Sequence, residues 1–419
     1  MKRKKILVIG TADNVGGAAR VGWNIAKGVE KFGYDTKFIV GDKHSDSLRV
    51  YELKKNSLVS KLGNKIRINL VSILRYGRSF LLANDIDFGA SEEILNHPWY
   101  KDADIIHMHN LHGDYFKLDT LRKISAEKPV VWTLHDKWAL TAHCAQCSDC
   151  KNLNNGKHFT PGLRHIYPIL WNNSDYLWNK KKSIYKQSKY LNIVTPSIWL
   201  ADLVKKGILK NKPLTVINNG VDTDVFKPRD KKKVRKELHL PLKKTIIAYV
   251  AQMGTVDSRK GGKYFLETAK NYSGNPDVVF LCIGGIIGNT PRQVNNVIFV
   301  PYISDDDEKL SHYYSSADIL LFTSLAENFP LVTLEALATG LPVVSFDVGG
   351  VKEQVSHKIN GYVAKYKDGD DLLCGLQFIL SLDRMGLKKM SLINRNKAVK
   401  EYSLGKMAYN YASLYKKLS

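Results

Sequence analysis

Two glutamates stand eight residues apart in the stretch Glu327-Asn-Phe-Pro-Leu-Val-Thr-Leu-Glu335, and this spacing could place both carboxylates beside one ligand. The stretch lies between an apolar run that ends at Thr323 and a helix that we predict to continue to Thr339. Ligands of open α/β sheets bind at the carboxyl ends of the strands, where this stretch would lie. The free N–H groups of a helix start attract a phosphate or a sugar oxygen, and a carboxylate can hold a ribose diol. The alternative is structural, with both glutamates placed only to favour the helix dipole.

A histidine–aspartate pair ends another predicted strand, in Trp132-Thr-Leu-His135-Asp136. An imidazole in this position can exchange hydrogen bonds with a sugar hydroxyl, and Asp136 could orient His135 or take the proton of an acceptor. A buried histidine with satisfied hydrogen bonds is the alternative. The preceding predicted strand also ends in polar side chains, to which we assign no role: His107, His109, Asn110 and His112.

Two glycines, Gly16 and Gly17, open the first predicted helix of the chain. Backbone without side chains lets a phosphate approach closely, so this pair could line an anion site. The stretch from Gly10 to Gly17 does not match G-x-G-x-x-G, so it lacks the dinucleotide-binding fingerprint.

A cysteine cluster follows the histidine–aspartate pair and could bind structural zinc. Its members are His143, Cys144, Cys147 and Cys150, with His158 as a further candidate ligand. This spacing could supply tetrahedral ligands, but one tight loop strains such a site and a second ligand pair is missing. We therefore favour free thiols over zinc. We expect the remaining two cysteines, Cys282 and Cys374, to lie in the core because apolar runs surround them.

Short apolar runs alternate with helix-like segments along the chain, which predicts parallel α/β sheets. In the first half, the runs span 4–10, 34–40, 104–109, 130–135 and 191–195. In the second half, they span 245–251, 278–283, 297–300, 319–323 and 343–346. Near-continuous apolar strands are buried on both faces, so we predict two doubly wound α/β domains. The turn signals Asn218, Asn219 and Gly220 mark the region of the boundary. We divide the chain into a first domain of residues 1–214, completed by a C-terminal helix over 403–419, and a second domain of residues 215–402.

Composition places the chain among globular proteins and gives it a strong positive charge. Its 419 residues are 44% apolar and 25% charged, which excludes collagen-like, low-complexity and wholly disordered classes. Lysine and arginine number 63 against 40 acidic residues, so the formal net charge is +23. Such an excess attracts nucleic acid, an acidic membrane or phosphorylated substrates. We find no helix-turn-helix, zinc-finger or aromatic RNA motif, so we expect no nucleic-acid partner.

One basic segment breaks the α/β pattern and suggests a membrane surface. Residues 53–82 interleave lysines and arginines with large apolar residues and contain no acidic residue. A basic amphipathic helix of this kind can lie on an anionic membrane, and the lysine cluster in 179–189 favours this interpretation. The alternative is a helix packed on its own domain. No apolar run is long enough for a signal peptide or a transmembrane helix. We therefore expect a cytoplasmic protein with reduced thiols, peripheral on the inner face of the cell membrane.

The block from Glu327 through Ala336-Leu-Ala-Thr-Gly-Leu-Pro-Val-Val-Ser-Phe-Asp-Val-Gly-Gly350 to Asn360-Gly361 resembles the donor-binding half of glycosyltransferase family 4. The Asn-Phe-Pro after Glu327 is most similar to the colanic-acid-type polysaccharide transferases of bacteria. The resemblance covers nearly the whole chain, with several motifs in the family's order. It implies retaining enzymes of the GT-B fold, with two Rossmann-like domains that face each other across a cleft. The first domain would be the acceptor side and the second the donor side.

The resemblance assigns donor-binding roles to residues of the second domain. Glu335 matches the glutamate that holds the nucleotide ribose, and Glu327 matches the one beside the donor sugar and the phosphates. Four further residues would line the donor site, three of them through backbone N–H groups: Asn328, Phe329, Leu331 and Val332. The family more often has a small polar residue where Leu331 stands, so we expect fewer contacts to sugar hydroxyls there.

Arg259-Lys260-Gly261 is similar to the basic clamp with which the family holds a diphosphate. Two cations beside a leaving diphosphate stabilise the charge that develops as the glycosidic bond breaks. A basic residue at a helix start is unfavourable, which argues against a purely structural role. Many members carry another arginine several residues earlier, where this chain has Gln252-Met-Gly-Thr.

In the first domain, the resemblance gives Gly16 and Gly17 the place of the family's Gly-Gly loop, and His135 the place of its active-site histidine. Asp136 is additionally present in the colanic-type form. Related transferases have a longer cysteine-rich loop after this pair, so the loop of this chain is similar to a shortened version.

Together these motifs imply a hexosyltransferase that moves a sugar from a UDP- or GDP-sugar to a hydroxyl of a lipid-linked saccharide. Closure of the two domains would bring Gly16, Gly17 and His135 against the diphosphate and the sugar. We expect no metal and no cofactor in catalysis, because no D-x-D motif stands where a metal-dependent transferase would need it. We identify no carboxylate nucleophile, so front-face attack is favoured. Two alternatives stay open: a transferase with another activated donor, such as a phosphorylase-like enzyme, and a non-catalytic nucleotide-sugar-binding protein of the same fold.

Overall fold

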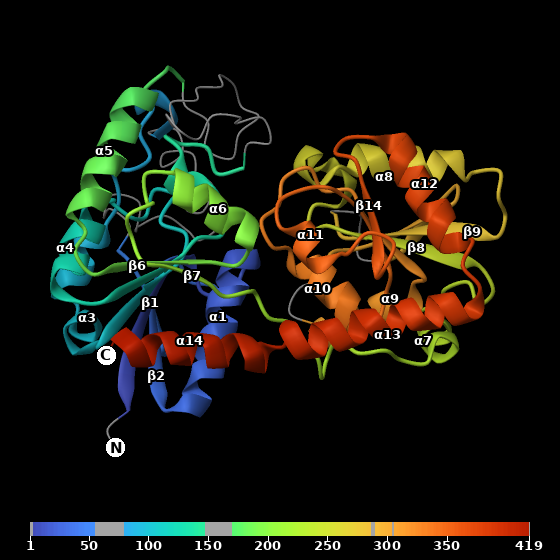
Figure 1. The fold of residues 1–419 in the computed structure, drawn as a ribbon, viewed down its shortest axis with the longest axis horizontal. Helices are drawn as coiled ribbons and strands as arrows, with labels where there is room; N and C mark the ends of the chain where they lie inside the picture. The colour runs from blue at the N-terminus through green and yellow to red at the C-terminus, as the bar shows by residue number, and fades with distance from the viewer. Residues whose placement is uncertain (1–2, 55–78, 147–169, 286–289, 304–305, 419) are drawn as a thin grey trace. The chain divides into compact units, whose positions relative to one another are not determined.

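The computed structural model describes residues 3–54, 79–146, 170–285, 290–303 and 306–418. The chain divides into two compact units, each built on one sheet with helices against it (Figure 1). The first unit comprises Met1–Asn218 and Met407–Ser419, and the second comprises Asn219–Lys406. The two doubly wound α/β domains predicted from the apolar runs are therefore present.

The first unit contains a seven-stranded parallel sheet in the order β3-β2-β1-β4-β5-β6-β7. Its strands are β1 (Lys4–Ala12), β2 (Tyr34–Asp42), β3 (Val50–Glu52), β4 (Ile105–Met108), β5 (Val130–Thr133), β6 (Leu191–Thr195) and β7 (Leu214–Val216). Its helices are α1 (Gly17–Val29), α3 (Pro98–Asp102), α4 (Asp119–Glu127), α5 (Ser174–Gln187), α6 (Ile198–Lys206) and α14 (Leu404–Leu418). The strand order reverses between β1 and β4, and loops at such a switch point commonly bind ligands.

The first unit extends beyond the boundary that we expected between 214 and 215. That boundary falls inside β7, which pairs in parallel with β6. Because this pairing holds the segment in the first sheet, the compact unit continues to Asn218.

Helix α14 brings the end of the chain back to the first unit. Its side chains Tyr411 and Tyr415 are buried there, and the hydroxyl of Tyr34 on β2 donates to the backbone of Ala412. Gly28 on α1 allows the close approach, because an added Cβ would lie 2.5 Å from the Cβ of Ala408. All seven tryptophans of the chain also lie in the first unit: Trp23, Trp99, Trp132, Trp138, Trp171, Trp178 and Trp199.

The second unit contains a seven-stranded sheet in the order β10-β11-β9-β8-β12-β13-β14, parallel except for the pair β10–β11. Its strands are β8 (Thr245–Val250), β9 (Val278–Ile283), β10 (Arg292–Val294), β11 (Val297–Val300), β12 (Ile319–Phe322), β13 (Val343–Phe346) and β14 (Gly361–Ala364). Its helices are α7 (Lys231–Glu237), α8 (Gly262–Asn271), α9 (Asp307–Ser316), α10 (Leu331–Ala338), α11 (Val351–Gln354), α12 (Gly369–Leu380) and α13 (Arg384–Glu401). Here the strand order reverses between β8 and β12.

One expectation about burial was wrong in part. Cys282 lies in the core, but Cys374 is exposed, because α12 buries the face that carries Leu372, Leu376 and Ile379. In the lysine cluster of α5, Lys181 is fully buried.

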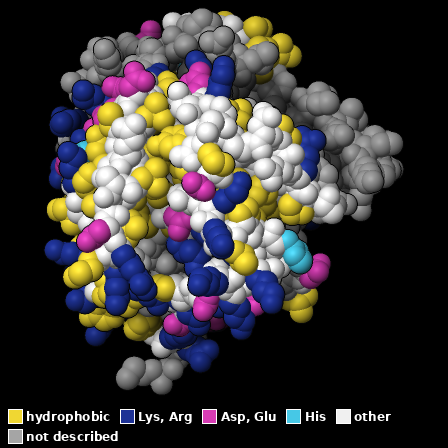
Figure 2. All heavy atoms as spheres, turned by 90° about the vertical axis from the view of Figure 1, so that its right-hand side faces the viewer, with side chains coloured by type: hydrophobic (Ala, Val, Ile, Leu, Met, Phe, Trp, Pro, Cys, Tyr) yellow, Lys and Arg dark blue, Asp and Glu magenta, His cyan; other side chains and the backbone are white. Residues whose placement is uncertain are grey.

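The basic side chains on one face of the molecule are not separated from the other side chains (Figure 2). On the face drawn in Figure 2, lysine and arginine side chains are interspersed with acidic and hydrophobic ones. The basic segment 53–82 falls mostly in 55–78, outside the described residues. Among the helices that the structure describes, none combines the length and hydropathy needed to cross a bilayer.

Candidate functional site

The switch point of the second sheet gathers the predicted donor-binding residues. The loop after β8 carries Arg259 and Lys260, and the loop after β12 carries Glu327. Because β8 and β12 are neighbours in the sheet, both loops leave the same edge side by side. The two sequence motifs are thus brought together, although about 70 residues separate them.

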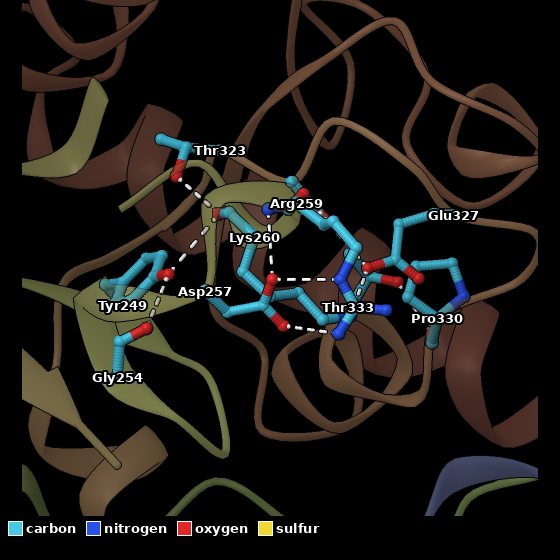
Figure 3. A network of polar contacts seen from close by, with 10 residues as sticks. Tyr249, Gly254, Asp257, Arg259, Lys260, Thr323, Glu327, Pro330 and Thr333 are labelled. Carbon is cyan, nitrogen blue, oxygen red and sulfur yellow. Dashed lines mark hydrogen bonds and ion pairs between the residues drawn. The ribbon is translucent and has the colours of Figure 1, made fainter. Parts of the chain in front are cut away.

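Asp257 orients Arg259 through a two-pronged ion pair (Figure 3). Its Oδ1 accepts hydrogen bonds from the backbone N and from Nε of Arg259, each at 3.0 Å, and Oδ2 accepts from Nη2 at 2.9 Å. Burial alone would raise the pKa of the Asp257 carboxyl, but the hydrogen bonds and charge of Arg259 hold it below its ordinary value. A paired guanidinium of this kind is pre-oriented for an anion.

Lys260 meets the first glutamate of the pair. Its Nζ lies 2.6 Å from Oε1 of Glu327, and the same oxygen accepts from the hydroxyl of Ser324 at 2.7 Å. The Lys260 side chain is 36% exposed and that of Glu327 is 10% exposed, so the ammonium stays accessible to a ligand while the carboxylate is largely enclosed. The two residues therefore offer one cation and one acceptor at a single place.

The backbone around this pair is tightly fixed. Gly261 has φ +68°, and an added Cβ would lie 1.9 Å from the carbonyl oxygen of Thr323. The hydroxyl of Thr323 donates to the carbonyls of Lys260 and Gly261 at 3.1 and 2.9 Å, and N–H of Leu325 donates to the carbonyl of Arg259 at 2.7 Å. The basic turn is consequently held against the loop that carries Glu327.

The start of α10 completes this part of the site. Leu331 and Val332 are its first residues, so their N–H groups have no acceptor within the helix. Glu335 is only 5% exposed, and its Oε2 accepts a hydrogen bond of 2.8 Å from the hydroxyl of Tyr314 on α9. Asn328 and Phe329 are also buried. The sequence predicted that these residues lie around one helix start, and they do; donor binding by them stays a prediction.

In the first unit, the predicted glycine pair opens α1. Gly16 precedes the helix with φ +92°, Gly17 is its first residue, and no atom lies within 4 Å of a Cβ added to either. The buried Asp13 holds this loop, because its carboxylate accepts from the backbone N–H groups of His44 and Ser45 at 2.9 Å each. The loop therefore presents bare backbone at the switch point of the first sheet.

His135 lies in a layer of histidines at the ends of β4 and β5. Its Nε2 is 2.9 Å from Nδ1 of His109, and the two rings are nearly parallel with centroids 5.2 Å apart. His107 lies behind them, bonded through Nε2 to Thr133 and through Nδ1 to Tyr415 of α14. Burial lowers the pKa of His135 to about 4 and that of His107 to about 3, so both rings are neutral near pH 7.

We had suggested that Asp136 could orient His135, but Asp136 forms its hydrogen bonds with other groups. Its Oδ2 lies 2.8 Å from Nε2 of His112, and its Oδ1 accepts from the backbone N–H of Trp138 at 2.8 Å. Burial alone would raise the pKa of the Asp136 carboxyl, but His112 and the backbone N–H keep it low. The buried Lys181 supports the same loop by donating to the carbonyls of Trp138 and Thr141.

The cysteine cluster is only partly described. His143 and Cys144 are buried, and burial raises the pKa of the Cys144 thiol to about 11. Cys147, Cys150 and His158 lie outside the described residues. Within the described part of the chain, no group of three or more histidine, cysteine or acidic side chains could hold a metal ion.

We had assigned no role to several residues that support the site: Asp257, Ser324, Tyr314, His109 and Lys181. Only Asp257 carried a usable signal, since an acid two residues before a basic pair can fold back on it. The others reach the site from separate elements, so their roles follow from the fold.

Two family descriptions match nearly all of the chain. Glycosyltransferase Family 4 matches residues 15–225, and Glycosyl transferases group 1 matches residues 230–399. A putative colanic acid biosynthesis glycosyl transferase, WcaC of Escherichia coli (strain K12), is 27% identical over 260 residues, which cover 59% of this chain and 61% of that protein. D-inositol 3-phosphate glycosyltransferase of Mycobacterium sp. (strain KMS) is 27% identical over 269 residues, covering 60% of this chain and 56% of that protein. The match thus spans about three fifths of each of these two relatives.

Solved structures share the whole fold at low identity. Sucrose-phosphate synthase of Thermosynechococcus elongatus has a TM-score of 0.72 at 17% identity, covering 99% of both chains. HepE of Anabaena, solved in complex with UDP-glucose, has a TM-score of 0.63 at 16% identity and covers 99% of this chain and 100% of its own. The two parallel-sheet, Rossmann-like domains are those of GT-B glycosyltransferases.

Proposed function

Because this chain belongs to glycosyltransferase family 4 and has the GT-B fold, we propose that it transfers a hexosyl unit from a nucleoside-diphosphate sugar to a hydroxyl of a saccharide. Membership of the family makes it a glycosyltransferase, and a relative named for colanic acid biosynthesis supports a role in polysaccharide or glycoconjugate synthesis. The observation that carries the finer proposal is the meeting of Arg259, Lys260 and the start of α10 at one switch point. HepE, which shares the fold, binds UDP-glucose, so a UDP-sugar is the first donor to test.

The donor diphosphate would bind between the basic turn and α10. Arg259, Lys260 and the N–H groups of Leu331 and Val332 would face its oxygens, and Glu335 would hold the ribose. As the glycosidic bond breaks, negative charge grows on the leaving phosphate, and these prearranged donors stabilise it without reorganising. This arrangement supplies the electrostatic stabilisation from the chain's own groups, so we propose metal-independent transfer.

The acceptor hydroxyl would react on the face of the sugar that the diphosphate leaves, with retention of configuration. Glu327 is paired with Lys260 and bonded to Ser324, which suits a role in holding the donor better than one as a nucleophile. The acceptor proton would pass to the leaving phosphate in this front-face mechanism. Asp136, already bonded to His112 and Trp138, would position its loop beside the acceptor.

We further propose that the acceptor is lipid-linked and that the protein binds an anionic membrane surface. The basic residues of 53–82 support this proposal, since a polybasic amphipathic segment is attracted to acidic headgroups. We propose no cofactor for catalysis, and for Cys144, Cys147 and Cys150 we propose free thiols rather than a structural zinc site shared with His143.

A thermal-shift screen with UDP-, GDP- and ADP-sugars tests the donor site. We expect one nucleotide class to raise the unfolding temperature, with a stabilisation of about 2.7 kcal/mol at a ligand concentration of 100 Kd. Lys260→Ala and Glu335→Ala should each abolish the shift. Lys263→Ala is the matched control, because that lysine is exposed on the next helix and pairs only with Glu267 in the interactions described.

Release of nucleoside diphosphate from the stabilising donor then separates enzyme from binding protein. Turnover that persists in a chelator supports metal-independent transfer, and turnover lost on chelation refutes it. A shift without any turnover would indicate a non-catalytic nucleotide-sugar-binding protein. A shift that survives both substitutions would place the donor elsewhere.

A further inference from the structure

We propose that His109 is a positioning residue that fixes the tautomer of His135, so that His135 presents an N–H at Nδ1 to the substrate. The inference rests on the proposed function only for the identity of that substrate. The sequence left open whether His135 donates or accepts a hydrogen bond, and the proposal makes it a donor through Nδ1.

His109 is held rigidly at the end of β4. Its backbone N–H donates to the carbonyl of Ile9 on β1, and its carbonyl accepts from Nε1 of Trp132 at 2.8 Å. The side chain is 3% exposed and packs against α1, where a Cβ added to Gly22 would lie 2.9 Å from Nε2 of His109. The ring therefore has one position, with Nδ1 toward His135 and Nε2 toward the helix backbone.

The two ring nitrogens of His109 differ in their surroundings. Nδ1 lies 2.9 Å from Nε2 of His135, whereas Nε2 is buried and has no hydrogen-bond partner among the described residues. Burial lowers the pKa of His109 well below its ordinary value, so the ring is neutral and carries one proton. A proton on Nε2 would be a buried N–H without an acceptor, while a proton on Nδ1 is used in the bond to His135. The Nδ1–H tautomer of His109 is therefore favoured.

The tautomer of His135 follows from that of His109. When Nδ1–H of His109 donates, Nε2 of His135 must be the acceptor, so the single proton of neutral His135 is on Nδ1. Among the described residues, Nδ1 of His135 has no hydrogen-bond partner. It is thus an N–H directed by His109 and available to a substrate oxygen, and His135 acts as a hydrogen-bond donor rather than as a base at this atom.

The tautomer can be measured without any substrate, by NMR of the full-length protein labelled with ¹⁵N in the histidine rings. The signals of His135 are identified by their loss in His135→Gln. We expect a protonated-type Nδ1 and an unprotonated-type Nε2 for His135 near pH 7. A protonated Nε2 in the wild-type protein would overturn the proposal whether or not the protein is a transferase.

A pair of variants tests the effect on the reaction. His109→Asn keeps an N–H donor near the position of Nδ1, and His109→Leu removes it. We expect kcat to fall roughly tenfold or more in His109→Leu, with the KM for the donor changed less than about threefold, and to recover largely in His109→Asn. Equal kcat values in the two variants would refute the positioning role.

If His109→Leu does not fold, the NMR signals of wild type and His109→Asn still decide the tautomer. If the wild type transfers no sugar, the proposed function fails while the tautomer assignment stands or falls by NMR.

Discussion

At the scale of single residues, the first unit buries histidines in their neutral form. Burial lowers the pKa values of His107, His109 and His135 below the ordinary value, and it also lowers that of His97. The unfolded chain therefore binds more protons than the folded one as the pH falls through the ordinary histidine pKa of about 6.5. The stability that the neutral rings contribute is present above that pH and is lost as the pH falls toward their folded pKa values.

This linkage predicts that acid destabilises the first unit well before its carboxylates titrate. Between about pH 6.5 and 5.5, each strongly shifted histidine should lower the free energy of unfolding by about 1 kcal/mol. Urea unfolding followed by tryptophan fluorescence measures this unit, because every tryptophan lies in it. His135→Gln should reduce the pH dependence by one histidine's share, and the exposed His44→Gln should leave it unchanged. A wild-type stability that is flat over this range would contradict the neutral cluster.

Much of the candidate site could be predicted from the sequence, because the motifs around Arg259, Glu327 and Glu335 are contiguous runs of characteristic residue types. It did not show which group neighbours which. The carboxylate of Asp136 was a natural partner for His135 in the sequence, yet it bonds to His112, while His135 bonds to His109. Such pairings depend on strand order and on side-chain direction, which a single sequence does not specify.

At the scale of elements, strands buried on both faces were the most predictable. The runs 191–195, 278–283, 297–300 and 343–346 coincide with β6, β9, β11 and β13. We did not predict the short strands β3, β7, β10 and β14, which have three or four residues each. The residues of β10 are all exposed, so no apolar run marks it. Pairing to a neighbour defines such strands more than their own composition does.

The turn that carries Lys260 depends on one glycine. We predict that Gly261→Ala lowers the free energy of unfolding of the second unit by at least about 2 kcal/mol, because it forces a side chain into a left-handed backbone and against Thr323. It should also abolish the donor-induced thermal shift. Circular dichroism is the suitable readout, since the second unit has no tryptophan.

Gly274→Ala is the matched control for this substitution. No atom lies within 4 Å of a Cβ added to Gly274, and its φ is not in the left-handed region. If both variants unfold at the same temperature, the strain assigned to Gly261 is absent.

Helix α14 supports the histidine layer from behind. The hydroxyl of Tyr415 lies 2.6 Å from Nδ1 of His107, and that of Tyr411 lies 2.9 Å from the hydroxyl of Thr133. We predict that Tyr415→Phe lowers the free energy of unfolding of the first unit by about 1–2 kcal/mol, since it removes the hydrogen-bond partner of the buried Nδ1 of His107. Urea unfolding by tryptophan fluorescence measures the loss. Lys416→Ala, on the exposed face of the same helix, should change it by less than about 0.5 kcal/mol.

At the scale of the whole molecule, membrane binding could come from the total net charge of +23 or from the position of basic residues in one segment. A general excess attracts any anionic surface weakly, whereas a basic amphipathic segment attracts one through a particular part of the chain. On the face drawn in Figure 2, basic side chains are interspersed with acidic and hydrophobic ones, so we favour the basic amphipathic segment as the origin of membrane binding.

We therefore predict that the segment 53–82 dominates binding to anionic vesicles. In liposome flotation with phosphatidylserine-containing vesicles, replacing Lys54, Lys55, Lys61 and Lys65 with glutamine should remove most of the floated protein. Replacing four exposed lysines of the second unit with glutamine, namely Lys232, Lys233, Lys236 and Lys243, gives a control of the same net charge. Equal losses in the two variants would show that only the total charge matters, and no loss in the first would refute the membrane proposal.

The return of residues 407–419 to the first unit has a consequence for how the protein is made. A ribosome delivers the whole of the second unit before it delivers the helix that completes the first. When all strands of the second unit have been synthesised, the first unit still lacks α14. At that stage, Nδ1 of His107 has not yet formed its hydrogen bond with Tyr415. Of the two units, the one that precedes the other in the chain is in this way the last to reach its native hydrogen bonding.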